Sequence, residues 1–481
     1  MAVKKIAVKR VKKPAKKKTA AKTASKRTKT KKASSKASIP EVEVPFVPNA
    51  GYKAWIVGVN MGYGHQRTAF PLRFLAPEEK VINANNYSGI PEKDKMIWES
   101  SRHVYEFISR LKNAPLIGDA CFSVLERFQK ILSYYPKRDL SESNFSVEQV
   151  YSLLRRGWGS HLISKLSKKH PGLPFITTFF NVAFMAEFFG YPGDIFCVIC
   201  DADVARAWAP LNPHITRIKY FVPNKRTAQR LESYGINRSN IIFSGFPLPL
   251  ENIGDERMEI LKEDLRYRLL NLDPKNSYRE RYHSLIDRHL GRLPLQPSHP
   301  LTIMFSIGGA GAQKEIGLEI LKNLKDKIIF GETKVILSVG NRESTKIYFE
   351  EEAERIGLSN ELKGNIEIIF EKNIQDYFSK FNAAIRKTDI LWTKPSELSF
   401  YSALGLPIIV APPIGSQENF NQRWILKSGF GANQEDPRYL GQWLFDWLEQ
   451  GYLAEAAMEA FVEGEQLGAL KIKEEIKKCF G

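Results

Sequence analysis

Cysteine is scarce in the 481-residue sequence, which contains only four. Four cysteines in a chain of this length do not make a disulfide framework, and this favours a reducing compartment. Cys197 and Cys200 form a single C-x-x-C, but no second cysteine pair or neighbouring histidine pair completes a zinc site. We therefore predict that these two cysteines lie on a buried strand, and we expect neither a metal nor a cofactor.

Long apolar runs are also missing. The most apolar stretch, residues 173–191, includes a proline, an asparagine and a glutamate, which a membrane span tolerates badly. Residues 1–18 contain no continuous apolar core of the length that a secretory signal needs. We expect a cytoplasmic protein that is soluble or peripheral at the inner face of a membrane.

Acidic residues are absent from residues 1–40, which hold 16 of the 71 Lys and Arg residues. The other 441 residues contain 55 basic and 53 acidic side chains, so most of the formal charge of +18 belongs to this segment. A tract of Lys, Ala, Thr and Ser cannot offset its own ordering entropy, and we predict a disordered tail over residues 1–45. Three roles stay open for it: a solvated tail without a partner, attraction to anionic lipid headgroups, and attraction to nucleic-acid phosphates.

From residue 51 the chain alternates short β-branched or aromatic runs with longer amphipathic segments, which is typical of parallel sheets covered by helices. The predicted strands form two series: 54–59, 80–84, 175–178, 196–200, 220–222 and 240–244, then 301–307, 334–339, 366–370, 390–393 and 408–411. We predict an α/β fold with two doubly wound, Rossmann-like domains. The predicted limits are 46–250 for the first domain, 251–300 for a charged helical insertion or linker, 301–438 for the second domain and 439–481 for C-terminal helices. Residues 94–135 are also predicted to form amphipathic helices.

A glycine turn follows the first strand of each series. In the first turn, Gly62 and Gly64 permit positive φ and close backbone approach, and they precede His65, whose imidazole is suited to a general base. The second turn leads into a helix whose N-terminus would direct free N–H groups at a phosphate. Its three glycines are Gly308, Gly309 and Gly311. Neither half ends its second strand with a clear acidic residue for a ribose, so a dehydrogenase is disfavoured.

Polar side chains follow the last two predicted strands. The carboxyl ends of strands form the ligand-binding edge of an open α/β sheet, although a solvated loop is the plain alternative for each segment. The residues after one strand are Lys394, Ser396 and Glu397, and those after the next are Gln417, Glu418 and Asn421.

Taken in chain order, these motifs resemble those of the two-domain GT-B glycosyltransferases of the family 28 type. The nearest relatives are the monogalactosyldiacylglycerol synthases and bacterial diacylglycerol glucosyltransferases, with the peptidoglycan N-acetylglucosaminyltransferase more distant. The matching motifs are G-Y-G-H at 62–65, D-x6-W at 201–208, Y-F-V-P at 220–223, S-G-F-P at 244–247, T-K at 393–394 and Q-E-x2-N at 417–421. Three departures mark a divergent branch: Pro395-Ser396 replaces Ala-Gly, Ser402 stands where an acidic residue usually holds the ribose, and Ala205 replaces a histidine.

The resemblance implies that a hexose moves from a nucleotide diphosphate sugar, a UDP-sugar, to a lipid or other hydroxyl acceptor without metal. His65 would be the general base, with Asp201 orienting it or sharing the role. Backbone N–H groups of the second glycine turn would stabilise the leaving diphosphate, and the backbone near Phe370 would hold the base. The sugar hydroxyls would be bound by Gln417, Glu418 and Asn421.

Two rival functions stay open. One is a nucleotide-sugar 2-epimerase, and the other is a catalytically degenerate nucleotide-sugar-binding protein that the tail tethers to a membrane or to nucleic acid. Asp201-Ala-Asp203 also matches the D-x-D metal motif of the other glycosyltransferase fold, but a structural or His-supporting role is favoured. Each basic residue near an anionic surface contributes about 1 kcal/mol to binding. If the enzyme modifies a lipid, a membrane is therefore the expected partner of residues 1–40.

Overall fold

The computed structural model describes residues 51–100, 131–307 and 313–481. The predicted tail, the second glycine turn at 308–312 and most of the helices predicted for 94–135 lie outside the described residues.

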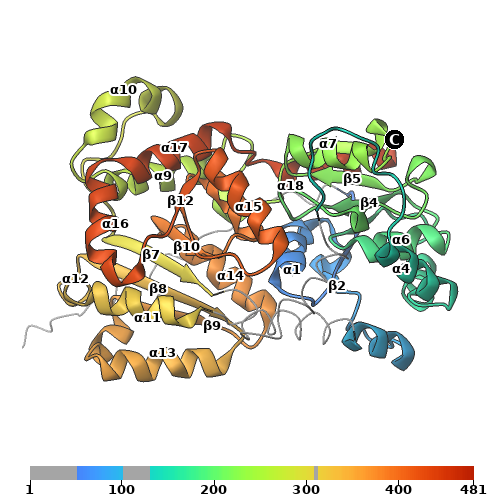
Figure 1. The fold of residues 1–481 in the computed structure, drawn as a ribbon, viewed down its shortest axis with the longest axis horizontal. Coiled ribbons are helices and arrows are strands. Elements are labelled where there is room, and N and C mark those ends of the chain that lie inside the picture. Colours follow the sequence, from blue (N-terminus) through green and yellow to red (C-terminus); the bar gives the residue numbers. More distant parts are fainter. Residues whose placement is uncertain (1–50, 101–130, 308–312) are drawn as a thin grey trace, which may run out of the picture. The chain divides into compact units, whose positions relative to one another are not determined.

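Two six-stranded sheets, parallel throughout, form the centre of the fold (Figure 1). The first has the order β2-β1-β3-β4-β5-β6 and the second the order β12-β11-β10-β7-β8-β9. The strands of the first are Trp55–Gly58 (β1), Ile82–Asn83 (β2), Phe175–Thr177 (β3), Ile195–Val198 (β4), Lys219–Val222 (β5) and Ile241–Phe243 (β6). Those of the second are Leu301–Ser306 (β7), Thr333–Gly340 (β8), Ile366–Phe370 (β9), Ile390–Thr393 (β10), Ile408–Val410 (β11) and Gly431–Asn433 (β12). The predicted α/β fold with two doubly wound, Rossmann-like sheets is confirmed.

Burial explains why the central strands could be predicted from the sequence. Every residue of β1, β4, β7 and β10 is buried, because helices cover both faces of a parallel sheet and favour continuous apolar runs. All the predicted strands are present, but β12 is an additional one. Its Gly431 lies so close to β11 that a Cβ atom there would be 2.0 Å from the carbonyl oxygen of Ile408, and glycine is a poor signal for a strand.

Helices follow most strands. In the first half they are Tyr63–Ala69 (α1), Phe145–Arg155 (α4), Ser160–Lys169 (α5), Phe180–Phe188 (α6) and Lys225–Ser233 (α7). In the second half they are Lys314–Asn323 (α11), Lys325–Ile329 (α12), Glu343–Arg355 (α13), Ile374–Ile385 (α14) and Ser416–Lys427 (α15). A 3-10 helix, Glu397–Leu404 (η7), follows β10. No helix of the described ranges is long and apolar enough to cross a membrane.

The charged segment between the two sheets is helical, as predicted, with helices Leu250–Ile253 (α8), Glu259–Leu272 (α9) and Ser277–Leu290 (α10). Arg268 of α9 is 2% exposed, and its guanidinium donates to the carbonyl oxygens of Thr388 at 2.8 Å and Leu404 at 2.7 Å. A buried guanidinium needs such acceptors. The segment therefore fixes the chain on both sides of β10, where several candidate site residues lie.

The C-terminal segment is also helical, with Leu440–Glu449 (α16), Tyr452–Glu463 (α17) and Gly468–Lys477 (α18). The last helix packs on the first sheet and not on the second (Figure 1). Its Ile472 and Ile476 are fully buried in a cluster that contains Ile56 of β1 and Phe196 of β4. The chain thus returns to the first sheet at its end. The predicted domain limits stay a prediction.

Candidate functional site

Each sheet has one point where the strand order reverses. In the first sheet this point lies between β1 and β3, and in the second between β7 and β10. Ligands of open α/β sheets bind outside the carboxyl ends of the strands at such a point. The segments that follow β1 and β10 carry His65 and Glu397, respectively.

His65 lies in the first turn of α1, directly after a glycine turn. Gly62 has φ of 103°, a left-handed conformation that favours glycine. The imidazole Nδ1 lies 2.7 Å from the carbonyl oxygen of Thr178, just past β3, and Thr178 Oγ1 donates to the carbonyl oxygen of His65 at 2.8 Å. A carbonyl oxygen only accepts, so Nδ1 carries the proton and Nε2 carries a lone pair. The neutral ring is held in the tautomer that a base at Nε2 requires.

The environment of His65 keeps the ring neutral. Burial lowers the pKa of His65 to about 4, although the Thr178 hydrogen bond and the charge of Glu397 both raise it. The ring packs edge-on against Phe179 at 4.8 Å between centroids, and Cys200 Sγ lies 3.6 Å from Nδ1. Burial also raises the pKa of Cys200, which leaves that thiol uncharged. The His65 ring is therefore neutral at pH 7, with its one proton on Nδ1.

Asp201 follows β4 and is held from the opposite sheet. Asn421 of α15, which is 1% exposed, donates through Nδ2 to Asp201 Oδ1 at 3.2 Å and accepts from the backbone N–H of Ala202 at 2.8 Å. Burial raises the pKa of Asp201 to about 6; the Asn421 hydrogen bond lowers it, and the charges of Glu397 and Glu418 raise it. A carboxyl that titrates near neutrality at a sheet edge is a group suited to acid–base chemistry.

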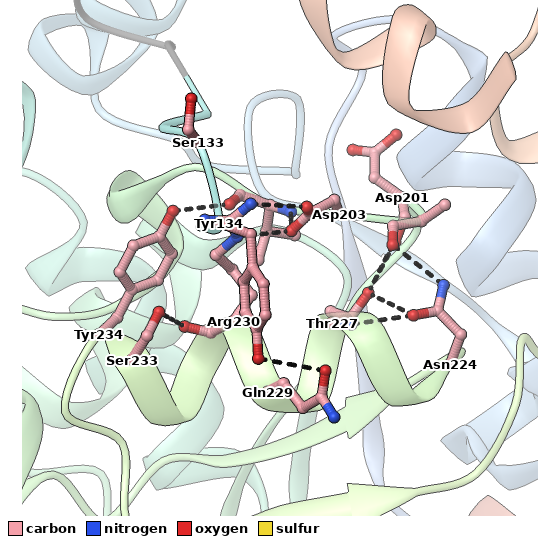
Figure 2. Close-up of polar contacts among 12 residues, drawn as sticks. Ser133, Tyr134, Asp201, Asp203, Asn224, Thr227, Gln229, Arg230, Ser233 and Tyr234 are labelled. Atoms are coloured by element: carbon pink, nitrogen blue, oxygen red, sulfur yellow. Dashed lines mark hydrogen bonds and ion pairs between the residues drawn. The ribbon is translucent and has the colours of Figure 1, made fainter. Parts of the chain in front are cut away.

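Asp203 has a different environment from Asp201. Arg230 of α7 donates to both of its carboxylate oxygens at 2.8 Å, and the two side chains are almost completely buried. Figure 2 shows this pair, with the Asp201 carboxylate pointing away from it. Thr227 of α7 and Asn224, which caps its start, donate to the carbonyl oxygen of Ala202, each at 3.0 Å, and so fix the backbone between the two aspartates. Asp203 is thus a structural residue.

Glu397 belongs to a buried ion pair between the two halves. Arg67 Nε lies 3.1 Å from Glu397 Oε1, and the residues are 2% and 8% exposed. Arg67 also donates to the Tyr377 hydroxyl at 3.3 Å. A Cβ atom on Gly64 would lie 3.2 Å from Glu397 Oε2, so the glycine turn and the carboxylate are in close contact. Because Gly64 has no side chain, α1 can lie close to η7 at this point.

Glu418 and Lys394 form a second ion pair at the edge of the second sheet. Glu418 Oε2 accepts from the backbone N–H groups of Ile414 at 2.6 Å and Gly415 at 3.3 Å, which caps the start of α15. Gln417 is half-buried in the first turn of the same helix. Both carboxylate oxygens of Glu418 are thus already engaged.

The remaining predicted residues are less close to this group. Ser396 precedes η7 and is half-buried, and its carbonyl oxygen accepts from Ser399 N–H at 2.9 Å. Phe370 ends β9, the outer strand of the second sheet, where Lys346 lies 5.8 Å from its ring centroid. Gly308, Gly309 and Gly311 lie outside the described residues. Ser402, at the position of the missing acidic residue, is fully buried and donates to Ser399 O.

The site thus brings together His65, Asp201, Lys394, Glu397, Glu418 and Asn421. Sequence reasoning missed Thr178 and Arg67. Thr178 had a usable signal, because it ends the predicted strand 175–178, next to the point where the order reverses. Arg67 had none, because its partner is 330 residues away. Within the described part of the chain, no group of three or more His, Cys, Asp or Glu residues is arranged to hold a metal ion.

Comparisons with known proteins give distant structural likenesses. MurG from Acinetobacter baumannii is similar at 12% identity and a TM-score of 0.45, covering 89% of this chain and 99% of its own. A UDP-GlcNAc 2-epimerase from Neisseria meningitidis bound to UDP-GlcNAc has 11% identity, a TM-score of 0.42 and coverages of 66% and 80%. A glycosyltransferase from Rickettsia africae has 13% identity, a TM-score of 0.37 and coverages of 71% and 84%. No protein-family model and no curated protein sequence matches the chain. The function therefore has to be inferred from the geometry of the site.

Proposed function

We propose that the protein is a glycosyltransferase that moves a hexose from a nucleotide diphosphate sugar, a UDP-sugar, to a hydroxyl acceptor. One observation carries this proposal: His65 is a neutral imidazole, fixed through Nδ1 by Thr178 O at 2.7 Å, at the point where the strand order of the first sheet reverses. Its free Nε2 is the group that a hydroxyl acceptor needs as a general base.

In the proposed reaction the acceptor oxygen forms a bond to the anomeric carbon while the bond from that carbon to the diphosphate breaks. The acceptor proton moves to His65 Nε2, and the nucleotide diphosphate leaves as an anion. The charge of Glu397 raises the pKa of His65 and so favours the imidazolium that forms. Asp201, when ionised, adds a second negative charge to the same edge of the site.

The donor would be held by the second sheet. We propose that backbone N–H groups at 308–311 and the start of α11 bind the diphosphate, and that the backbone near Phe370 binds the base. Gln417 would contact the sugar, since Glu418 and Asn421 already have partners and act as positioning residues. Lys394, paired with Glu418, supplies positive charge on the donor side.

A nucleotide-sugar 2-epimerase stays a second candidate, because one observation favours it. The charges of Glu397 and Glu418 both raise the pKa of Asp201. An epimerase needs such groups to remove and return a proton on the sugar. Incubation with a panel of nucleotide sugars, with and without lipid extract, separates the two. Transfer predicts nucleotide release and a larger product only when an acceptor is present. Conversion of the donor without any acceptor would establish the epimerase instead.

We further propose that the acceptor is a lipid and that residues 1–40 hold the enzyme at an anionic membrane. This segment contains 16 basic residues and no acidic ones. Each basic residue near an anionic surface would contribute about 1 kcal/mol to the free energy of binding. Deleting residues 1–40 should reduce sedimentation with vesicles that contain anionic lipid, with uncharged vesicles as the control. A deletion that changes only retention on DNA would contradict the membrane proposal and favour nucleic acid.

A further inference from the structure

A large cavity lies beside the candidate site. Its volume is about 1180 Å³, and it is bounded by α7 and the segment 131–135 on one side and by η7, α15 and α17 on the other. Neither His65 nor Asp201 lines it, and the proposed transfer does not use it. The volume is slightly above the roughly 300 to 1,000 Å³ that is typical of sites for small molecules.

Two arginines of α7 form one wall of this cavity. Arg226 and Arg230 are four residues apart, which places them on the same side of the helix. Arg230 is 1% exposed and uses Nε and Nη2 to hold Asp203. Its Nη1 atom and the Nη1 atom of Arg226 are both buried, and within the described ranges neither has a hydrogen-bond partner. Arg226 also forms no ion pair with a described residue. Among the residues that the structure describes, two buried guanidinium N–H groups therefore lack an acceptor at one place.

Tyr134 holds the two guanidinium groups in position. Its ring centroid lies 3.9 Å from Arg226 Cζ and 5.3 Å from Arg230 Cζ, and its hydroxyl donates to Gln229 Oε1 at 3.2 Å. Figure 2 shows Tyr134 alongside Arg230, with its hydroxyl reaching Gln229. Stacking on an aromatic face limits the rotamers of a guanidinium and leaves its edge free to donate. The N–H groups are thus oriented before a ligand binds.

Another part of the lining is aromatic. Phe246 and Phe400 stack with ring centroids 4.9 Å apart, and Trp424 lies 4.9 Å from Phe400 and 5.4 Å from Phe430. Phe243, which also lines the cavity, is 36% exposed. Phe243 and the half-buried Trp424 thus offer an apolar chain a surface to cover, and the buried rings hold Trp424 in place.

The distribution of charge in the cavity favours an anion beside α7 over one beside α17. Glu459 and Glu463 belong to α17, and Glu465, just past its end, is paired with Lys471. Further cations, Arg423 and Lys427, lie on α15 and are exposed. Exposed charges are screened, whereas buried guanidinium groups bind anions strongly.

We propose that this cavity binds a phosphoryl group that carries an apolar chain. The phosphoryl oxygens accept from guanidinium N–H groups of Arg226 and Arg230, and the chain lies against Phe243 and Trp424. A phosphoryl group fits better than a carboxylate, because it has three acceptor oxygens and carries up to two negative charges beside two guanidinium groups. The proposal is independent of sugar transfer, since binding is measured with no nucleotide sugar present.

Calorimetric titration of the full chain with octyl phosphate, inorganic phosphate and octyl glucoside tests the proposal. Octyl phosphate should bind at least about tenfold more tightly than either of the other two, because a charged hydrogen bond and the chain both contribute. Arg226→Gln should weaken octyl phosphate binding about tenfold or more. Lys427→Gln, a cation on the exposed rim, is the matched control and should change it less than about twofold.

A second variant guards against misfolding. Arg230→Gln alone leaves Asp203 buried without its partner, so Arg230→Gln is combined with Asp203→Asn, which removes both charges. The double variant should lose octyl phosphate binding to the same extent as Arg226→Gln while its circular dichroism spectrum is unchanged. Equal loss in Lys427→Gln and Arg226→Gln, equal affinity for octyl phosphate and octyl glucoside, or equal affinity for octyl phosphate and inorganic phosphate would each overturn the proposal.

Discussion

The carboxyl edges of the two sheets use charged side chains in different ways. At the first sheet, burial moves the pKa of His65 to about 4 and that of Asp201 to about 6, so both are adjusted for proton chemistry. At the second sheet, Glu397 and Glu418 are held in ion pairs by Arg67 and Lys394. One edge carries groups that gain or lose a proton, and the other carries fixed charges. The difference teaches that similar sheets divide the work of the proposed transfer, with chemistry on one and positioning on the other.

The largest effect is expected when the base on the first sheet is removed. His65→Ala should reduce sugar transfer by about 100-fold to 10,000-fold, which is the contribution typical of a general base, while donor binding stays within a few-fold. The rate of nucleotide release and donor titration measure the two quantities. His283→Ala, an exposed histidine on α10, is the control and should leave both unchanged. Full activity in His65→Ala would remove His65 from the mechanism and with it the contrast between the two edges.

The next effect concerns the fixed charges at the second sheet. Arg67→Met should lower the free energy of unfolding by about 3 to 5 kcal/mol, because Glu397 is left buried without its partner. Adding Glu397→Gln should restore much of the loss, since no charge then stays buried. Chemical denaturation measures both variants. Arg438→Met, which breaks an exposed pair with Asp436, should have little effect; an equal loss there would show that burial does not decide the result.

Replacing Asp201 tests whether the carboxyl edge of the first sheet carries a group that titrates near neutrality. Its folded-state pKa of about 6 lies above its ordinary value, so its contribution to stability is present at low pH and is lost as the pH rises through about 6. Asp201→Asn should therefore raise the free energy of unfolding above pH 6, by about 1 to 3 kcal/mol. In the unsubstituted protein we expect the transfer rate to rise as the pH passes about 6 and Asp201 ionises; Asp201→Asn should remove this rise. Asp203→Asn, which breaks the buried pair with Arg230, should destabilise instead. The same sign for both aspartates would contradict the distinction between them.

The smallest effect is expected at the contact between the two edges. Gly64→Ala places a Cβ atom 3.2 Å from Glu397 Oε2, so the carboxylate must shift slightly. We expect a loss of about 1 kcal/mol in the free energy of unfolding. Gly441→Ala on α16 has its nearest atom at 3.7 Å and is the matched control; it should be neutral or slightly stabilising. No difference between the two variants would show that the edges do not need this close approach.

The parts of the fold that depend on local pattern could be predicted from the sequence. Buried strands such as β4 and β7 are apolar along their whole length, and the position of His65 after a glycine turn was visible as a motif. Contacts between distant residues could not be predicted. The pairing of Arg67 with Glu397 and the return of α18 to the first sheet each depend on a partner far away in the chain. The strand β12 pairs with the neighbouring β11 and was missed because its glycine is a poor signal for a strand.

The candidate site shows the same limit. The sequence indicated His65 and Asp201, but it did not show that Thr178 fixes the tautomer of His65. It also did not show that Asn421 donates to Asp201 and accepts from the backbone N–H of Ala202; sugar binding by Asn421 stays a prediction. Motifs identify which residues meet at a sheet edge, while their roles depend on hydrogen bonds that only the folded chain defines.

The protonation state of His65 tests the central claim most directly, because it requires no knowledge of the substrate. Nitrogen-15 NMR of the imidazole, followed through a pH titration of the full chain, reports both the tautomer and the pKa. The expected result is a ring protonated at Nδ1 that stays neutral until the pH falls to about 4. A ring protonated at Nε2, or one that titrates at the ordinary value near 6.5, would contradict the account.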